Sequence, residues 1–249
     1  MHIFITGGTR GIGLGLVKEF LKRGHSVSYT GTQQKSIDKH ISELEGSFLP
    51  IICDIRSRKQ IETAKDLAMD KFKSIDIWIN NAGVDQDRLE VSDLSEEEIK
   101  RVIDINVIGM MLGTSVALKE MKKQNYGVVY NMEGLGSNNM KIPKTLIYGS
   151  SKRLLTYFSQ GCNKELKNYK NIFVGTFQPG MVFTDLLMNN MGDDGMKIAR
   201  ILGSEVEEVA PFLVEKALKG KKTIKFLTTR KVLYRFLTSP FKHKKDHRS

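Results

Sequence analysis

Tyr148 and Lys152, in the stretch YGSSK, are the residues whose types and spacing point most directly to chemistry. Side chains four residues apart on a helix project from one face, so a phenol and an ammonium would lie close together. A tyrosine with a pKa of about 10 shuttles protons poorly near neutrality, and lowering that pKa by about 2 to 3 units requires roughly 3 to 4 kcal/mol of phenolate stabilisation. A nearby ammonium can supply much of it. The pair therefore predicts proton donation to an oxygen that gains charge.

Alternating strand and helix patterns surround this pair. Short apolar, β-branched runs predict strands at 2–6, 26–30, 48–53, 75–80, 126–131 and 172–178, and helical spacing predicts helices at 12–23, 34–45, 57–72, 95–124 and 148–168. Such alternation predicts one α/β domain over residues 1–228, with a doubly wound parallel sheet and helices on both faces. Residues 180–203 are expected to form a mobile loop before a last helix at 205–219.

The stretch TGGTRGIG, Thr6 to Gly13, directly follows the first predicted strand and opens the first helix. Its glycines Gly7, Gly11 and Gly13 allow a tight turn, close approach of the backbone to a pyrophosphate, and close packing of helix on strand. The free N–H groups of the helix N-terminus suit a phosphate. The motif predicts that the chain binds a nucleotide.

Together with NNAG at 80–83, Asn106, YGSSK and PGMVFT at 179–184, this motif resembles the short-chain dehydrogenase/reductase family over essentially the whole chain. The resemblance implies a Rossmann-like domain, NAD(P)(H) at the carboxyl ends of the strands, and a catalytic Tyr-Lys-Asn-Ser set that includes Tyr148, Lys152 and Asn106. It also implies the cofactor-binding residues Gly7, Thr9, Arg10, Gly11, Ile12, Gly13, Thr32, Asp54, Ile55, Asn81, Ala82, Gly83, Tyr148, Lys152, Pro179, Gly180, Val182 and Thr184.

The end of the second strand bears on the choice of cofactor. NAD-specific sites usually place a carboxylate there, but this chain has Thr30-Gly31-Thr32-Gln33. Arg10 and Lys35 would add positive charge beside a 2′-phosphate, although both could equally be ordinary solvated side chains. NADPH/NADP⁺ is therefore predicted over NADH. Asp54 either resembles the family's adenine-contacting aspartate or caps the next helix.

The usual serine of the family is missing. Counting back 13 residues from Tyr148 gives Leu135, and matching the strand end at Asn131 gives Glu133-Gly134, so the nearest hydroxyl belongs to Ser137. Losing one donor to an oxyanion costs about 2.7 to 4 kcal/mol. Three explanations remain: Ser137 reaches the site, a backbone N–H near Gly134 replaces the hydroxyl, or the protein is an inefficient reductase. The first two are favoured, and Ser137 is included in the catalytic set.

This departure resembles a subgroup of the family, the chlorophyll b reductases, through NMEGLGS, YGSSK, QPGMVFTDLL and KFLTTRKVLYRFLT. That resemblance implies reduction of the C7 formyl group of chlorophyll b, or of a similar bulky apolar aldehyde, to the alcohol. Several methionine and leucine side chains after residue 180 could form a flexible apolar mouth for the substrate, or they could simply pack a loop and a helix. They are Met181, Leu186, Leu187, Met188, Met191 and Met196. The alternatives are a generic NADP-dependent ketone or hydroxysteroid-type oxidoreductase and a non-catalytic dinucleotide-binding regulator.

The net charge of +11 lies entirely in residues 216–249, which hold 12 Lys or Arg and one acid. A basic extension at 229–249 is therefore predicted, either as a solvated tail or as a contact with an anionic membrane. Its segment RKVLYRFL could equally pack on the body or on another subunit. Nucleic-acid binding is not expected, because no reading module accompanies the tail.

Two cysteines, Cys53 and Cys162, are too few for a disulfide framework and lie in apolar contexts that suit inert core thiols. No metal site is predicted. The chain also shows no apolar segment of the length and character of a targeting or spanning sequence, so a cytoplasmic location, with peripheral membrane contact through the tail, is expected. A homodimer or homotetramer through the helices at 95–124 and 148–168 is expected by analogy with the family.

Overall fold

The computed structural model describes residues 1–189 and 191–238, which form a parallel sheet of seven strands. The strand order is β3-β2-β1-β4-β5-β6-β7. The strands are β1 (His2–Thr6), β2 (Ser26–Gly31), β3 (Phe48–Ile52), β4 (Ile77–Asn80), β5 (Gly127–Met132), β6 (Ile172–Gln178) and β7 (Thr223–Lys225). The order runs outward in both directions from β1 and β4, so the predicted doubly wound α/β fold is confirmed. The short edge strand β7 was not predicted.

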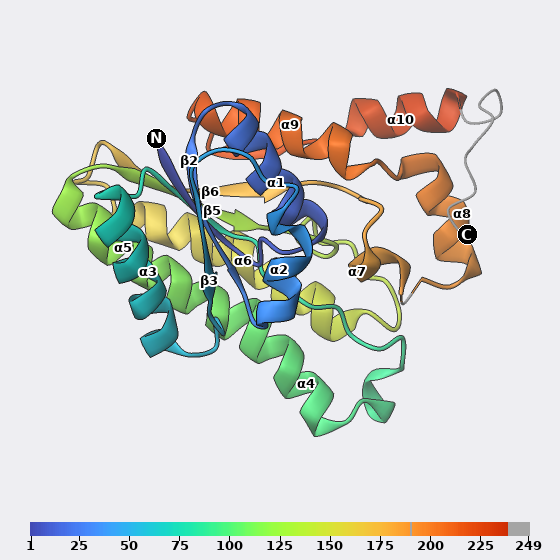
Figure 1. Cartoon of the computed structure of the whole chain (residues 1–249). Helices are drawn as coiled ribbons and strands as arrows, with labels where there is room; N and C mark the ends of the chain where they lie inside the picture. Colours follow the sequence, from blue (N-terminus) through green and yellow to red (C-terminus); the bar gives the residue numbers. More distant parts are fainter. Residues whose placement is uncertain (190, 239–249) are drawn as a thin grey trace.

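Helices cover both faces of the sheet (Figure 1). On one face α1 (Gly11–Lys22) and α9 (Val206–Leu218) bury Leu16, Phe20 and Leu213 against the strands. On the other, α3 (Arg58–Phe72), α5 (Met110–Gln124) and α6 (Leu146–Glu165) enclose a second core in which the rings of Phe4 and Trp78 stack with centroids 4.0 Å apart. The short α2 (Gln34–Ile41) follows β2. Strands buried on both faces explain the nearly continuous apolar runs of the sequence.

The single helix predicted at 95–124 has a π-helical middle. It begins with α4 (Glu96–Ile103), widens at η2 (Asp104–Gly109) and continues as α5. By length and composition alone the stretch Glu96–Gln124 could cross a membrane, but half of its most apolar window is buried inside the domain. Burial of that kind is typical of a core helix. The π-turn matters because it contains Asn106, and π-turns inside helices frequently occur at functional sites.

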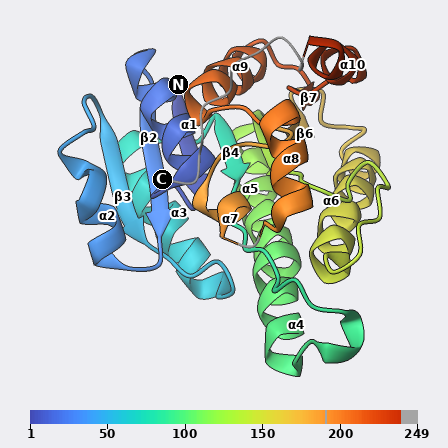
Figure 2. The same cartoon turned by 90° about the vertical axis from the view of Figure 1, so that its right-hand side faces the viewer.

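The segment expected to form a mobile loop is in large part helical. Its described residues include α7 (Asp185–Met188) and α8 (Asp193–Leu202), which lie in front of the carboxyl ends of the strands in Figure 2. The prediction was wrong because the apolar side chains Met196 and Ala199, spaced for one helix face, are buried. Met196 therefore packs inside and cannot line a substrate mouth. Met181, Leu186, Leu187, Met188 and Met191 are half-buried.

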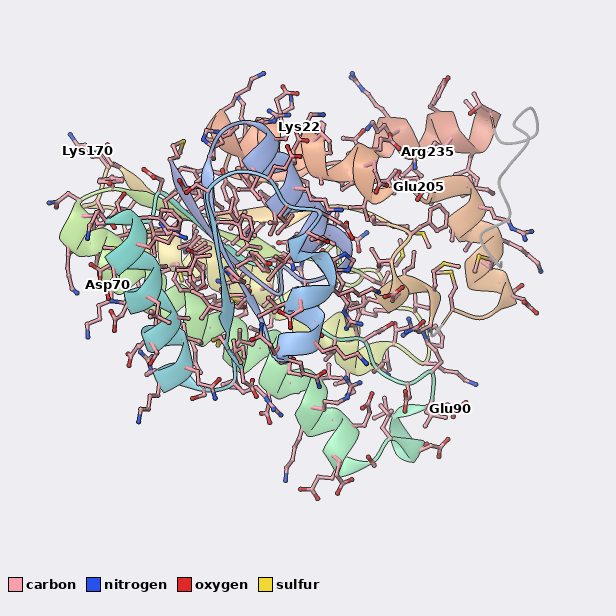
Figure 3. All side chains as sticks on the ribbon, viewed as in Figure 1. Lys22, Asp70, Glu90, Lys170, Glu205 and Arg235 are labelled. Carbon is pink, nitrogen blue, oxygen red and sulfur yellow. The ribbon has the colours of Figure 1, made fainter. Side chains whose placement is uncertain are left out.

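The described part of the predicted basic extension forms α10 (Thr229–Thr238), which packs beside α8. The guanidinium of Arg235 donates to the carbonyls of Leu202 at 2.7 Å and Gly203 at 2.9 Å, and it points back toward the junction of α8 and α9 (Figure 3). The Nζ of Lys231 lies 3.7 Å from the centre of the Phe226 ring. Lys231 and Arg235 thus attach α10 to the body, while residues 239–249 lie outside the described residues.

Candidate active site

The glycine loop between β1 and α1 has the shape that a pyrophosphate requires. Gly7 and Gly11 have positive φ angles of 65° and 52°, and a Cβ on Gly13 would overlap the carbonyl oxygen of Gly7. Arg10, the residue that precedes α1, makes no side-chain cap, so no side chain of the N-cap occupies the first-turn N–H groups. A side chain at Gly13 cannot be fitted without moving backbone, whereas a phosphate can approach these N–H groups. The loop therefore fits the phosphates of a dinucleotide.

The NNAG stretch braces this loop. The side-chain amide of Asn81 donates to the carbonyls of Thr6 at 3.1 Å and Gly7 at 2.9 Å, and the backbone N–H of Ala82 donates to the Thr6 hydroxyl at 3.1 Å. A Cβ on Gly83 would lie 3.2 Å from Oδ1 of Asn106 and 3.3 Å from Nζ of Lys152. The stretch therefore connects the glycine loop to two of the predicted catalytic residues.

Asn106 is 1% exposed and holds the chain that follows β4. Its Oδ1 accepts from the N–H of Val84 at 2.9 Å, and its Nδ2 donates to the Val84 carbonyl at 2.8 Å and to the hydroxyl of Ser151 at 3.2 Å. The π-turn places this side chain between the β4 loop and α6. Asn106 is thus tied to the helix that carries Tyr148 and Lys152.

Tyr148 and Lys152 occupy successive turns of α6, as their spacing predicted. The backbone N–H of Tyr148 donates to Oε1 of Gln86 at 2.8 Å, and Nζ of Lys152 donates to the Met132 carbonyl at 3.2 Å. The ammonium lies 5.7 Å from the centre of the Tyr148 ring. This arrangement brings both side chains to the carboxyl end of β5.

Burial dominates the proton affinities of the pair. It lowers the pKa of Lys152 to about 8, against the opposing charges of Glu133 and Asp85. Burial also raises the pKa of Tyr148, with Asp85 adding to the rise and Arg88 opposing it. Burial thus outweighs the lowering of the Tyr148 pKa that the spacing of the pair predicted.

The turn after β5 shows where the family's serine would stand. A Cβ on Gly134 would lie 2.6 Å from Oη of Tyr148 and 3.3 Å from Cγ of Lys152. Gly136, with a φ of 98°, lies so close to α6 that a Cβ would reach 2.6 Å from Cα of Gly149. Gly134 therefore lies directly against the phenol of Tyr148, at a position that carries no side chain.

Ser137 turns away from this point. Its hydroxyl donates to the Gly134 carbonyl at 2.7 Å, and its N–H reaches the same oxygen at 3.1 Å. Among the hydrogen bonds of the described residues, none joins Ser137 to Tyr148. Ser137 closes the turn that contains Gly134.

The remaining predicted cofactor residues lie around the same end of the sheet. Thr184 is close to the glycine loop, since a Cβ on Gly11 would lie 3.2 Å from its Cγ2. Val182 is bridged to Ser204, and Gly180, which follows Pro179, has a φ of 80° and approaches Leu227. Thr9 packs on Gly31, where a Cβ would lie 2.5 Å from its Cγ2.

Beside these residues, Thr32 and Arg10 are exposed, Ile12 is partly buried and Ile55 is 6% exposed. The carboxylate of Asp54 is bound by the guanidinium of Arg56 at 2.6 to 3.0 Å. Ser57, not Asp54, caps α3, because its side chain accepts from the N–H of Gln60. The helix-cap alternative for Asp54 is therefore wrong.

Sequence reasoning missed three groups around Tyr148. Gln86 is fully buried beneath the Tyr148 N–H, and Arg88 binds the carboxylate of Asp85 at 2.6 Å. Glu133 is 2% exposed at the end of β5. Gln86, Asp85 and Arg88 follow NNAG without a distinguishing pattern, whereas Glu133 belongs to the NMEGLGS segment, which the sequence singled out without giving its carboxyl group a role.

Neither cysteine has the environment of a reactive thiol. Cys53 and Cys162 are free and buried, and burial raises the pKa of both, that of Cys53 to about 11. Within residues 1–189 and 191–238, no group of His, Cys, Asp and Glu side chains could hold a metal ion.

Two plant reductases are similar to the chain over most of its length. It is 34% identical over 223 residues to chlorophyll(ide) b reductase NOL of Oryza sativa subsp. japonica, with 86% of this chain and 65% of the relative covered. It is 32% identical over 262 residues to the probable chlorophyll(ide) b reductase NYC1 of Arabidopsis thaliana, with 96% of this chain and 53% of the relative covered. Both relatives are named as chloroplastic. The chain therefore spans between about half and two thirds of their length.

Solved structures share the fold. A 3-ketoacyl-(acyl-carrier-protein) reductase from Brucella melitensis, complexed with NADH, matches with a TM-score of 0.78 at 22% identity, covering 93% of this chain and 92% of that one. A serine dehydrogenase complexed with NADP⁺ matches with a TM-score of 0.79 at 24% identity, covering 91% and 94%. The sequence model for short chain dehydrogenases matches residues 1–194. The chain belongs to the short-chain dehydrogenase family, whose members are oxidoreductases that bind NAD(P)(H) and act on CH–OH and C=O groups.

Proposed function

We propose that this chain is an NADPH-dependent reductase of an aldehyde on a bulky apolar substrate, with the C7 formyl group of chlorophyll b as the first candidate. One observation carries the proposal: Tyr148, Lys152 and Asn106 converge at the carboxyl ends of the strands, next to a turn in which glycine replaces the usual serine. The similarity to the two plant reductases supports the candidate substrate.

The choice of NADPH rests on the end of β2. Thr32 and Gln33 are exposed there without an acidic side chain, and the exposed Arg10 and Lys35 are positively charged. A 2′-phosphate would be attracted to these cations, whereas the ribose hydroxyl of NAD would find no carboxylate. The cofactor, when bound, supplies the hydride. Gly7, Gly11 and Gly13 would hold its pyrophosphate, and Lys152 and Thr184 its nicotinamide end.

In this proposal Tyr148 donates its proton to the carbonyl oxygen as that oxygen gains negative charge. Because its pKa is raised, Tyr148 holds its proton near neutral pH and can donate it, and the cationic Lys152 would stabilise the phenolate that remains. Asn106 fixes the position of α6 through Ser151. The proton would then return to Tyr148 from solvent near Lys152.

The role of Ser137 remains a proposal with two forms. Because its hydroxyl is engaged by the Gly134 carbonyl, the contacts favour a backbone N–H near Gly134 as the second donor to the substrate oxygen. In the other form, the Ser137 hydroxyl leaves that carbonyl when substrate binds. A Ser137→Ala variant separates them, since only the second form predicts a loss of about 100-fold or more in kcat.

Exposed apolar side chains on the two segments that flank Tyr148 support a bulky apolar substrate. They are Leu89, Val91, Met140, Ile142 and Leu146, each between 38% and 53% exposed. Half-buried Leu186, Leu187 and Met188 on α7 add flexible apolar surface beside Thr184. A tetrapyrrole presents a wide apolar face that would cover such a surface.

The second candidate is a generic ketone or hydroxysteroid-type oxidoreductase, favoured by 30% identity over 188 residues to a 3alpha-hydroxysteroid dehydrogenase of Mediterraneibacter gnavus. NADPH oxidation measured with formyl tetrapyrroles, simple aldehydes, ketones and hydroxysteroids separates the two. Turnover of the formyl tetrapyrrole with formation of the alcohol supports the first candidate; steroid or ketone turnover alone overturns it. Tyr148→Phe that binds NADPH serves as the inactive control, and a non-catalytic regulator would show no turnover to lose.

Membrane contact through α10 forms the second part of the proposal. Leu233, Tyr234, Phe236 and Leu237 are 64%, 60%, 47% and 68% exposed, whereas Lys231 and Arg235 face the body. This outward apolar face leads into a basic tail with Lys242, Lys244, Lys245 and Arg248. Apolar side chains beside a basic segment suit an anionic lipid surface. We propose a cytoplasmic, peripherally bound protein.

A homodimer or homotetramer is proposed through η2, α5 and α6. These helices expose the large apolar side chains Ile108, Leu154 and Tyr157, the last 82% exposed. An uncovered apolar face on long helices is a suitable contact between copies of one chain. Analytical ultracentrifugation of Tyr157→Asp, compared with the parent chain, tests this assignment.

A further inference from the structure

Glu133 is a buried carboxyl group for which the proposed reaction has so far given no role. It follows β5 directly, continues the sheet by donating its N–H to the Phe177 carbonyl at 2.8 Å, and is 2% exposed. Its Oε1 accepts from the hydroxyl of Thr156 at 2.9 Å. Its Oε2 is buried and accepts no hydrogen bond from the described residues. Gln178 and Ser137 nevertheless lie near enough to lower the pKa of the carboxyl group.

Such a group needs an explanation, because burying a carboxyl group without full hydrogen bonding is costly. Burial raises the pKa of Glu133, so the fold alone would be better served by a neutral side chain. The neighbouring cation is Lys152, which stands one turn before Thr156 on α6 and donates to the carbonyl of Met132, the residue before Glu133. Glu133 therefore stands beside the lysine of the proposed site.

We propose that Glu133 is a positioning residue that keeps Lys152 positively charged during catalysis. It does so from a buried position directly after β5. The inference rests on the proposed function only for its activity readout. The charged groups that act on the Lys152 and Tyr148 pair from the surrounding elements are Glu133 after β5 and Asp85 after β4, the latter bound to Arg88. Of the two acids, Glu133 makes the larger contribution to Lys152.

The negative charge of Glu133 directly affects the protonation of Lys152. Burial pulls the pKa of Lys152 down to about 8, and Glu133 opposes that fall. Without the negative charge, Lys152 would lose its proton at lower pH, and the phenolate of Tyr148 would lose its stabilising cation.

The experiment measures the titration of Lys152 by NMR of the full chain labelled with ¹³C at lysine Cε, with the resonance assigned through Lys152→Arg. In Glu133→Gln the midpoint is expected to fall by about half to one pH unit, and in Glu133→Asp to return toward the parent value. Glu165→Gln, an exposed acid near the end of the same helix, is the matched control and should leave the midpoint in place.

Activity provides the second readout. In Glu133→Gln the apparent pKa of the alkaline limb of the kcat/KM profile should fall by the same amount, about half to one pH unit. The rate at the alkaline end should therefore fall about 3- to 10-fold. A midpoint and an alkaline limb that both match the parent chain would overturn the proposal. A chain without any reductase activity would contradict the proposed function alone, because the NMR titration needs no substrate.

Discussion

Gly134 stands against Tyr148: a Cβ on Gly134 would lie 2.6 Å from the phenolic oxygen. That distance is shorter than side chains tolerate, so the turn after β5 must be glycine while Tyr148 keeps its present position. If Gly134 stands at the position of the family's serine, this contact excludes a serine side chain there. The space that a serine side chain would take belongs to the tyrosine hydroxyl.

Gly134→Ser should therefore reduce activity rather than restore a family feature. The new side chain would displace Oη of Tyr148 and crowd Cγ of Lys152. We expect kcat/KM to fall at least about tenfold, since a displacement of the reacting group by about 1 Å can cost about 100-fold. Steady-state kinetics on the best aldehyde checks this, with Gly161→Ser of α6 as the control because nothing lies within 4 Å of its Cβ position. An unchanged or higher rate would show that Tyr148 has room to move.

Tyr148→Phe should abolish reduction while leaving the fold intact. The N–H that bonds to Gln86 is a backbone group and remains in the variant, and the phenol oxygen makes no hydrogen bond with the described residues. A loss of about 100- to 10,000-fold in kcat is expected when the general acid is removed. Stopped-flow NADPH oxidation measures the loss, and NADPH fluorescence should show binding close to that of the parent chain. Residual activity within a few-fold of the parent would exclude Tyr148 as the proton donor.

Gly13→Ala should weaken dinucleotide binding. A Cβ there would overlap the Gly7 carbonyl and lie 2.4 Å from Nδ2 of Asn81, so the glycine loop and its brace must both shift. We expect a loss of at least about tenfold in NADPH affinity, measured by fluorescence titration. Gly161→Ala is the matched control, since an alanine there meets no neighbour and favours the helix. Equal affinities in the two variants would contradict the assigned phosphate site.

The stability of Glu133→Gln should depend on pH in a defined direction. Burial raises the pKa of Glu133 in the folded chain, so the carboxyl group contributes favourably below its unfolded pKa, and this contribution is lost as pH rises through the folded pKa. The amide has no such loss. Near neutral pH the variant should be at least as stable as the parent and more stable by about 1 kcal/mol if the carboxylate is fully charged. Urea unfolding at pH 7.5 and pH 4.5 measures the difference in the free energy of unfolding between the variant and the parent chain, and this difference should be smaller at pH 4.5. A variant that is less stable than the parent only at neutral pH would contradict the prediction.

The sequence predicted the elements whose residue patterns are local. It did not predict the elements and environments that depend on which side chains become buried in the fold. The glycine loop, Tyr148 and Lys152 could be located because their chemistry requires fixed types at fixed spacing. The helices α7 and α8 were missed because Gly, Asn and Asp conceal the spacing of Met196 and Ala199, which only their burial against the body reveals. The environments of Glu133 and Gln86 depend on contacts across the sheet and on α6. A single sequence carries no signal for such long-range contacts.

The spacing of Tyr148 and Lys152 also could not predict their pKa values. The i, i+4 relationship placed Lys152 near Tyr148, and this was correct, but spacing says nothing about solvent. Lys152 is only 5% exposed and Tyr148 is half-buried, so each is pushed toward its neutral form, and the tyrosine is a weaker acid than the pair alone suggested. Burial has the largest effect on the pKa of Lys152, and the neighbouring charges of Glu133 and Asp85 oppose it.

The apolar face of α10 should control membrane association if the proposed contact is correct. Leu233 and Leu237 lie one turn apart and are 64% and 68% exposed, so replacing both by Asp would place two charges on the proposed lipid-facing side. Binding to vesicles of phosphatidylcholine with one quarter phosphatidylserine, measured by co-sedimentation, should weaken about tenfold or more. Leu67→Asp on α3, where the side chain is 48% exposed, tests for a nonspecific effect of charge. Activity on a small soluble aldehyde should stay unchanged in both variants, and parent-like vesicle binding by the α10 variant would exclude this face as the lipid contact.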